Sequence, residues 1–312
     1  MSARAAAPPA GAVGVSSAFG TFGELLQGQT GDGVDFLVTL PIARWTTATF
    51  RLDPDLPGIR VWPEHKHKAV RLARAMVSVS GYAGGGSLTL DSALPEGKGL
   101  SSSSADLVAT ARAVANALGR ALTPAAIERQ LRRIEPTDGV MYDGITAFDH
   151  RRVRLRARLG ALPPLTIVGL DEGGVVDTIA FNRRPKPYDH VWRREYENLL
   201  ARLTAAVRCV DVAEVGRVAT RSAELNQPLQ PKRTFEALAA AATRIKALGV
   251  VTAHSGSVVG LLLADDDPAY DQKRSAARQA CRELAGHCFV DRTLTFRTAI
   301  DPPAGSFRDR AA

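Results

Sequence analysis

The sequence predicts an α+β protein with two domains. Segments rich in β-branched and aromatic residues are mixed with segments of helical periodicity, and the pattern has a seam near Gly160. With 312 residues, of which 45% are hydrophobic, the chain is long enough to build two hydrophobic cores. We expect an N-terminal domain over residues 15–160, a C-terminal domain over 161–312, and a disordered leader over 1–14, where prolines and glycines interrupt an apolar run.

The first half begins with extended segments. Residues 33–42 and 45–53 are rich in β-branched and aromatic residues and are bounded by glycine, proline and aspartate, which is typical of strands. Residues 65–81 have the pattern of a helix, and residues 85–94 alternate as a short strand does. We therefore expect two strands, a helix and a third strand before the serine-rich stretch that follows.

A helix is predicted directly after four consecutive serines at 101–104. Apolar residues recur there at helical spacing, and Gly119 is well placed to end the helix. One of Ser102, Ser103 and Ser104 is expected to supply the N-cap.

The next helix is predicted over residues 123–136. Thr123 is its expected N-cap, Pro124 occupies the first turn, and Pro136 ends it. The arginine-rich segment 151–160 also reads as helical.

The second half mixes strands with long helices. The pattern predicts a strand over 164–171, helices between 190 and 249, a strand over 257–264, a helix over 267–286 and a final strand over 293–300.

Composition excludes several classes of function. The net charge of +8 comes largely from dispersed arginines, and no dense basic tract interleaved with aromatics is present, so we expect no nucleic-acid partner. The three cysteines are irregularly spaced and predict reduced thiols rather than disulfides or a zinc site. No apolar run is long enough for a membrane span, which favours a cytoplasmic protein without a membrane partner. The oligomeric state stays open, with a homodimer as one candidate.

The stretch "LPEGKGLSSSSADLVATARAVANALG" raises the question of a phosphate site. A glycine-rich turn here meets a helix N-terminus, where unpaired backbone N–H groups and the helix dipole favour an anion. Gly97 and Gly99 permit close backbone approach, and serine hydroxyls add donors or a magnesium ligand. No GxxxxGK[ST] loop occurs in the chain. A capped helix that binds nothing is the alternative.

The same stretch resembles the central motif of the GHMP kinase superfamily, which includes galactokinase, homoserine kinase and mevalonate kinase. The motif is roughly a proline, a few residues, then Gly-Leu-Gly/Ser-Ser-Ser-Ala. Ser101 departs from it, because many members carry glycine or alanine there. The matching residues are Pro95, Gly99, Leu100, Ser102, Ser103 and Ala105.

Two other segments extend the resemblance in the right order. "AFGTFGELLQG" (18–28) stands where the first motif lies, close to the acceptor, and "TAHSGSVVGLLLA" (252–264) resembles the third motif. Together with "EPTDGVMYDGITAFDHR" (135–151), their wording is similar to one branch, the L-threonine kinase family of propanediol utilisation and cobalamin biosynthesis. The resemblance runs from about Ser17 to Ala264.

The resemblance implies a two-domain GHMP kinase fold, with a ribosomal-protein-S5-domain-2-like N-terminal domain and a ferredoxin-like C-terminal domain. It implies an ATP-dependent kinase that uses Mg²⁺ and converts L-threonine to O-phospho-L-threonine, a precursor of aminopropanol phosphate. Two alternatives stay open. One is a kinase for serine, homoserine or a specialised hydroxy acid, and the other is a non-catalytic binding protein of the same fold.

The resemblance also implies residue roles for the nucleotide and the metal. Ser103 is expected to bind magnesium together with a glutamate, for which we prefer Glu135 and keep Glu128 open, since the two lie seven residues apart on one predicted helix. The ATP-binding residues are expected to be Pro95, Gly97, Lys98, Gly99, Leu100, Ser101, Ser102, Ser103, Ser104 and Ala105.

For the acceptor, Asp138 is the candidate catalytic base, with an orienting group or a turn residue as alternatives. Glu24 is expected to bind the substrate ammonium, and His150, Arg151 or His254 its carboxylate. The other expected substrate-binding residues are Thr21, Gln27, Ser255, Gly256 and Ser257. A position near the site, without a role, is expected for Asp171, Gly173, Gly174 and Asp177.

Overall fold

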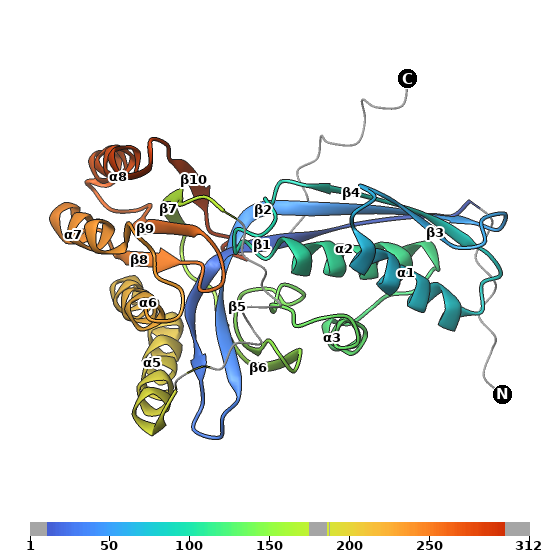
Figure 1. The fold of residues 1–312 in the computed structure, drawn as a ribbon, viewed down its shortest axis with the longest axis horizontal. Helices are drawn as coiled ribbons and strands as arrows, with labels where there is room; N and C mark the ends of the chain where they lie inside the picture. The colour runs from blue at the N-terminus through green and yellow to red at the C-terminus, as the bar shows by residue number, and fades with distance from the viewer. Residues whose placement is uncertain (1–10, 175–185, 187, 297–312) are drawn as a thin grey trace.

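A continuous ten-stranded sheet crosses the molecule in the computed structural model, which describes residues 11–174, 186 and 188–296 (Figure 1). Its strands lie in the order β10-β7-β9-β8-β1-β2-β4-β3, with β5 added to β2 and β6 to β5. The strands are β1 (Val13–Gln29), β2 (Asp35–Asp53), β3 (Ile59–Trp62), β4 (Gly85–Ser92), β5 (Ile145–Asp149), β6 (Arg154–Gly160), β7 (Leu165–Asp171), β8 (Gly249–Thr252), β9 (Val258–Ala264) and β10 (Phe289–Arg292). The helices are α1 (His67–Ser80), α2 (Ser102–Ala117), α3 (Pro124–Leu131), α5 (His190–Cys209), α6 (Val212–Asn226), α7 (Phe235–Ile245) and α8 (Tyr270–Ala285).

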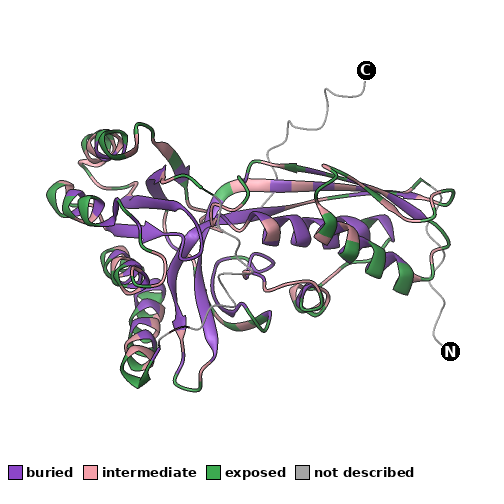
Figure 2. Ribbon diagram, viewed as in Figure 1, coloured by how far each residue is buried: buried purple, intermediate pink, exposed green. Residues whose placement is uncertain are grey.

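Helices cover the sheet in two groups, which Figure 1 shows at opposite ends of the molecule. α1 and α2 lie along the part formed by β1, β2, β4 and β3, whereas α6, α7 and α8 lie against the part formed by β7, β8 and β9. α5 packs against α6, β1 and β6. α2 is buried along nearly its whole length, while the outer faces of α5 to α8 are exposed (Figure 2). A helix enclosed in this way places its N-terminus inside the molecule rather than at the surface.

The two long strands β1 and β2 connect these parts. They are 17 and 19 residues long and pair antiparallel, with register shifts between Phe19 and Leu26. These irregularities fall inside the segment 18–28 singled out in the sequence. β1 meets β8 through one register pair, Glu24 with Thr252, so Glu24 lies where the two parts of the sheet join.

Several predicted elements are confirmed, including the helix after the serines, the helices between 190 and 249 and the strands around 165–171 and 258–264. Thr123 caps α3 as expected, accepting a hydrogen bond from Ala126 N. The two strands predicted over 33–42 and 45–53 form the single strand β2. Within the described residues, no helix is long and apolar enough to cross a membrane.

The predicted helix over 151–160 is wrong, because most of this segment is strand β6. Arg154, Arg156 and Arg158 are exposed and alternate with more buried Leu155 and Leu159. That is a period of two, which belongs to a half-buried strand and not to a helix.

The N-cap prediction for α2 is also wrong. The N-cap is Ser101, with φ of 57°, and its side chain does not cap the helix. The left-handed conformation costs a non-glycine residue on the order of 1 to 3 kcal/mol. It also accounts for the motif, because glycine adopts this conformation without that cost.

Three element boundaries differ from expectation. α3 ends at Leu131, so Glu135 lies beyond it and does not share a helix face with Glu128. The last strand is β10, which pairs with β7, whereas Thr293 makes only an isolated bridge and residues 297–300 lie outside the described residues. β1 begins at Val13, inside the predicted leader, of which residues 1–10 are likewise outside the description. The predicted domain boundary after residue 160 stays a prediction.

The close packing of α6 on β8 gives a stability prediction. A Cβ atom on Gly216 would lie 2.1 Å from the backbone oxygen of Leu248, which cannot move without shifting the chain. We expect Gly216→Ala to lower the free energy of unfolding by about 1 to 3 kcal/mol. Denaturant unfolding measures this, with Gly58→Ala as the control because a Cβ at Gly58 meets nothing within 4 Å. Equal stability of the two variants would contradict the close approach.

Candidate active site

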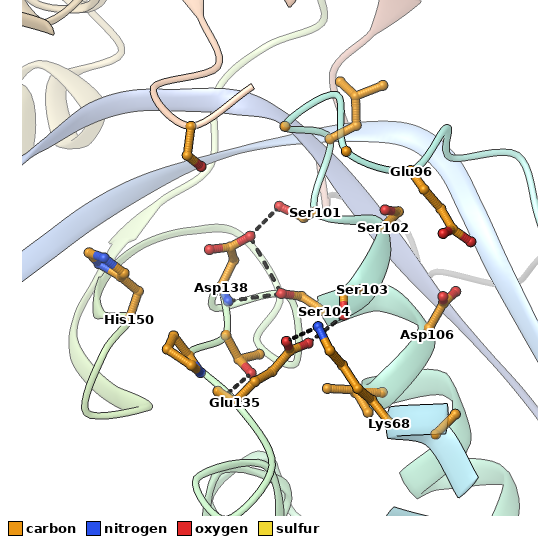
Figure 3. Close-up of a pocket in the computed structure, with 18 of the residues that line it drawn as sticks. Lys68, Glu96, Ser101, Ser102, Ser103, Ser104, Asp106, Glu135, Asp138 and His150 are labelled. Atoms are coloured by element: carbon orange, nitrogen blue, oxygen red, sulfur yellow. Dashed lines mark hydrogen bonds and ion pairs between the residues drawn. The ribbon is translucent and has the colours of Figure 1, made fainter. Parts of the chain in front are cut away.

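A cavity of about 420 Å³ lies at the N-terminus of α2 (Figure 3). The loop before α2, the loop after α3 and the irregular middle of β1 all contribute to its wall. The predicted site residues that line it are Glu24, Gln27, Gly97, Gly99, Leu100, Ser101, Ser102, Ser103, Ser104, Glu135, Asp138, His150 and Ser255. The sequence segments that resembled three separate motifs therefore meet around one cavity.

Backbone hydrogen bonds hold these segments together. Thr21 N donates to Leu100 O at 3.2 Å and Gly23 N to Gly99 O at 3.0 Å, which joins β1 to the loop before α2. On the other side of that loop, Ser257 N donates to Lys98 O at 3.1 Å.

Two glycines allow the loops to cross this closely. A Cβ on Gly256 would lie 2.1 Å from Lys98 O, and one on Gly99 would lie 2.3 Å from the Cβ of Ala253. Gly99 also has φ of 84°, which favours glycine in its own right.

The first turn of α2 has the chemistry of an anion site. Its leading backbone N–H groups, at Ser102, Ser103 and Ser104, have no helical acceptor and stand at the positive end of the helix dipole. All three residues line the cavity. These donors suit the oxygens of a nucleotide phosphate.

The donor set for a metal ion is formed by Ser103 and Glu135. The Ser103 hydroxyl donates to Glu135 Oε1, and Lys68 Nζ pairs with Oε2 of the same carboxylate (Figure 3). A hydroxyl beside a carboxylate matches the oxygen ligands that Mg²⁺ prefers, and the lysine shows that this carboxylate already holds a cation there. The residues present therefore fit the magnesium ion that the motif implies.

Asp138 is held against the same helix turn. Its Oδ2 accepts hydrogen bonds from Ser101 Oγ at 2.6 Å and Ser104 Oγ at 3.5 Å, and its backbone N donates to Ser104 Oγ at 3.0 Å. Ser101 Oγ also lies 2.5 Å from Thr21 Oγ1, so Thr21 is hydrogen-bonded to the serine that holds Asp138. Desolvation and the negative charge of Glu24 raise the pKa of Asp138 to about 7, although the serine hydrogen bonds oppose them. A carboxyl group with this pKa exchanges a proton near neutral pH.

Glu24 is a buried carboxylate fixed from one side. Its Oε2 accepts from His254 N at 3.0 Å and lies 2.9 Å from His254 Nδ1. The other ring nitrogen of His254 lies 2.7 Å from Ser222 Oγ. His254 is only 1% exposed and both of its ring nitrogens already have partners, so it positions Glu24 instead of binding a ligand.

Gln27, three residues after Glu24 in β1, also lines the cavity. Its Oε1 atom is buried and has no hydrogen-bond partner among the described residues. A buried amide oxygen without a partner is costly, so this atom is available to a ligand donor.

Other predicted residues support the site without lining it. Lys98 pairs with Asp171 at 2.6 Å and donates to Gly174 O at 2.7 Å, which ties the loop before α2 to the end of β7. Ser257 Oγ donates to the same aspartate at 2.6 Å. The remaining non-lining residues are Pro95, Ala105, Thr21, Gly256 and Arg151. Asp177 lies outside the described residues.

Glu128, the alternative metal ligand, lies elsewhere. Its Oε1 accepts from Tyr142 Oη at 2.9 Å and from Leu155 N at 2.7 Å, so it holds α3 against β6. Of the two candidate metal ligands, Glu135 is the one that lines the cavity.

Sequence reasoning missed one wall of the cavity, formed by the start of α1. Lys66 pairs with Asp106 at 2.6 Å and with Glu96 at 2.5 Å, and Lys68 reaches Glu135. The signal was present in "HKHK" at 65–68, because basic residues are disfavoured at a helix N-terminus unless they have acidic partners.

Comparison with known proteins places the chain in a family. The family model for the GHMP kinases N terminal domain matches residues 67–146. The L-threonine kinase of Salmonella typhimurium is 29% identical over 282 residues, covering 88% of this chain and 90% of that protein. The L-threonine kinase of Citrobacter freundii is 30% identical over 245 residues, covering 77% of this chain and 83% of that protein.

The chain belongs to the L-threonine kinase family of GHMP kinases. Its members are ATP-dependent kinases, and this chain is one of them. The homoserine kinase of Cytophaga hutchinsonii has the same fold, with a TM-score of 0.69 and 16% identity over 90% of this chain and 95% of that one. The predicted GHMP kinase fold is therefore confirmed, while the finer assignment of two domain types stays a prediction.

Proposed function

We propose that this member of the L-threonine kinase family transfers the γ-phosphoryl group of ATP to the side-chain hydroxyl of L-threonine. One observation carries the proposal. A single cavity contains a fixed carboxylate suited to an ammonium group, Glu24, and a helix N-terminus suited to phosphates. Asp138 is bonded to the helix turn and feels the charge of Glu24, so it lies near both. The L-threonine kinase relatives, which match over most of the chain, support this acceptor.

In this mechanism Glu24 and Gln27 bind the substrate ammonium group and direct the hydroxyl toward Asp138. The N–H groups at the start of α2 bind the phosphates of ATP. Ser103 and Glu135 hold the Mg²⁺ ion, which neutralises phosphate charge when bound. Lys68, released from Glu135, adds positive charge beside the transferred group.

The chemical step needs few protein atoms. The threonine hydroxyl oxygen forms a bond to the γ-phosphorus, the bond from that phosphorus to the β,γ-bridging oxygen breaks, and ADP leaves. The hydroxyl proton passes to the Asp138 carboxylate. Both serine hydrogen bonds go to Oδ2 of Asp138, and neither goes to Oδ1. The product is O-phospho-L-threonine, and cobalamin biosynthesis is its proposed setting.

A substrate panel tests the proposal directly. ATP consumption with Mg²⁺ is measured with L-threonine, L-serine, L-homoserine and D-threonine, and product mass is confirmed. We expect kcat/KM for L-threonine to exceed that for L-serine by at least about tenfold, the effect of one methyl group in a shaped pocket. A preference for serine or homoserine would move the enzyme to another acceptor. Absence of turnover together with absence of ATP binding would contradict a kinase.

Asp138→Asn tests the base. We expect kcat to fall by at least about 100-fold, while KM for ATP changes little, because the amide cannot accept the proton. Since the pKa of Asp138 is raised to about 7, the acid form dominates below that pH. Wild-type kcat/KM should therefore fall as pH drops below about 7, and this limb should be missing in the variant. Asp143→Asn, an exposed residue outside the cavity, serves as control. Equal losses in kcat and ATP affinity would indicate a structural role.

Ser103→Ala tests the metal ligand. We expect the Mg²⁺ concentration for half-maximal activity to rise by at least about tenfold, because the ion loses a hydroxyl ligand. Ser104→Ala is the matched control, since Ser104 bonds to Asp138 and should affect kcat rather than the Mg²⁺ curve. An unchanged Mg²⁺ curve for Ser103→Ala would overturn the assignment.

A further inference from the structure

Lys232 is a buried cation that the proposed mechanism does not yet use. It is 5% exposed, and among the described residues the only hydrogen-bond partner of its Nζ atom is the backbone oxygen of Gln230, at 3.4 Å. No ion pair of the described residues includes it, although a buried ammonium is costly without one. Such a group needs an anionic partner.

Lys232 does not line the cavity itself, but its segment is fastened next to Glu24, which does. It follows α6, and its backbone N donates to Gln227 Oε1 at 2.8 Å. Asn226, the last residue of α6, donates to His254 O at 3.1 Å. The segment that carries Lys232 is therefore fastened to the same loop that fixes Glu24.

The charges of Glu172 and Glu24 both act on Lys232. Burial lowers the pKa of the Lys232 ammonium to about 8, while these two carboxylates oppose the shift. At pH 7 the group is therefore still mainly protonated. Glu172 Oε1 is bonded to Thr234 N at 2.7 Å and to Thr234 Oγ1 at 2.8 Å, so it is committed to the backbone after Lys232.

Four other basic residues near the cavity already have partners or a proposed role. Arg151 pairs with Asp35 at 2.7 Å and Lys66 with Asp106 at 2.6 Å, and Lys68, which pairs with Glu135, is assigned to the phosphoryl group in the proposed mechanism. His254 uses its ring nitrogens on Glu24 and Ser222. An amino-acid acceptor brings a carboxylate next to the ammonium that Glu24 receives, and that carboxylate needs a cation close to Glu24.

We propose that Lys232 binds the α-carboxylate of the amino-acid acceptor while Glu24 binds its α-ammonium group. This inference rests on the proposed function and adds a determinant of specificity to it. The weak contact with Gln230 is given up when the carboxylate arrives, and the flexible lysine stem allows the ammonium to reach it. Together the two residues select a zwitterion and reject a simple alcohol or an amine.

The test compares two substrates that differ only in the group Lys232 is proposed to bind. L-Threonine and L-threoninamide share the hydroxyl and the ammonium, but the amide has no negative charge. We expect the wild-type enzyme to prefer L-threonine in kcat/KM by at least about 30-fold, the loss found when one partner of a buried charge pair is removed. In Lys232→Met this ratio should approach one, because only the reaction of L-threonine is slowed.

Lys186→Met is the matched control, because Lys186 is a second buried lysine that feels the charge of Glu24 but pairs with Asp35 at 3.4 Å. It should keep the wild-type ratio. Calorimetric titration gives a second readout, in which Lys232→Met should bind ADP normally and lose L-threonine binding. Lys232→Arg keeps the charge and should retain discrimination, which covers the case in which the methionine variant does not fold.

Three results would overturn the inference. In the first, the wild-type enzyme has the same kcat/KM for L-threonine and L-threoninamide. In the second, Lys232→Met lowers kcat/KM for both substrates equally. In the third, the preference for L-threonine is lost in Lys186→Met and not in Lys232→Met. Failure of the wild-type enzyme to phosphorylate L-threonine, while it phosphorylates another acceptor, would instead reject the proposed function itself.

Discussion

Burial of the Glu24 carboxylate at the junction of β1 and β8 is the constraint around which the site is arranged. A carboxylate in this position is costly unless it is hydrogen-bonded, and the backbone and ring of His254 meet that requirement. The backbone of Glu24 also forms the register pair between β1 and β8. The same residue therefore joins the two parts of the sheet and presents a charge to the cavity.

Two further carboxylates line the same cavity, and the serines at the start of α2 give them different partners. Ser101 and Ser104 bond to Asp138, whereas Ser103 bonds to Glu135, which also pairs with Lys68. Glu135 thus has a cation, while Asp138 has only neutral donors and feels Glu24, which raises its pKa. Neighbouring carboxylates with different partners are suited to different tasks, one to hold a metal and the other to accept a proton.

Local secondary structure and the segments with distinctive motifs could be predicted from the sequence. The α2 helix and the glycine-rich turn before it were predicted, and the candidate residues Glu24, Asp138 and Ser255 line one cavity. Three failures have separate physical causes. The residues of β6 were given the period of a helix, although they alternate as a strand does. The hydroxyls of Ser101, Ser103 and Ser104 bond to Asp138 and Glu135 instead of capping α2. The isolation of Lys232 depends on which charges lie near it in space, and sequence spacing does not contain that information.

The crossing of the loops has a consequence for attempts to redesign the enzyme. Gly99 and Gly256 pack backbone against backbone, and β1 donates hydrogen bonds to the loop before α2 from its irregular middle. None of the three segments has room to accept a neighbour of different shape. An acceptor site from another kinase of this fold would therefore have to be transplanted as three segments at once, because the backbones of these segments contact one another directly.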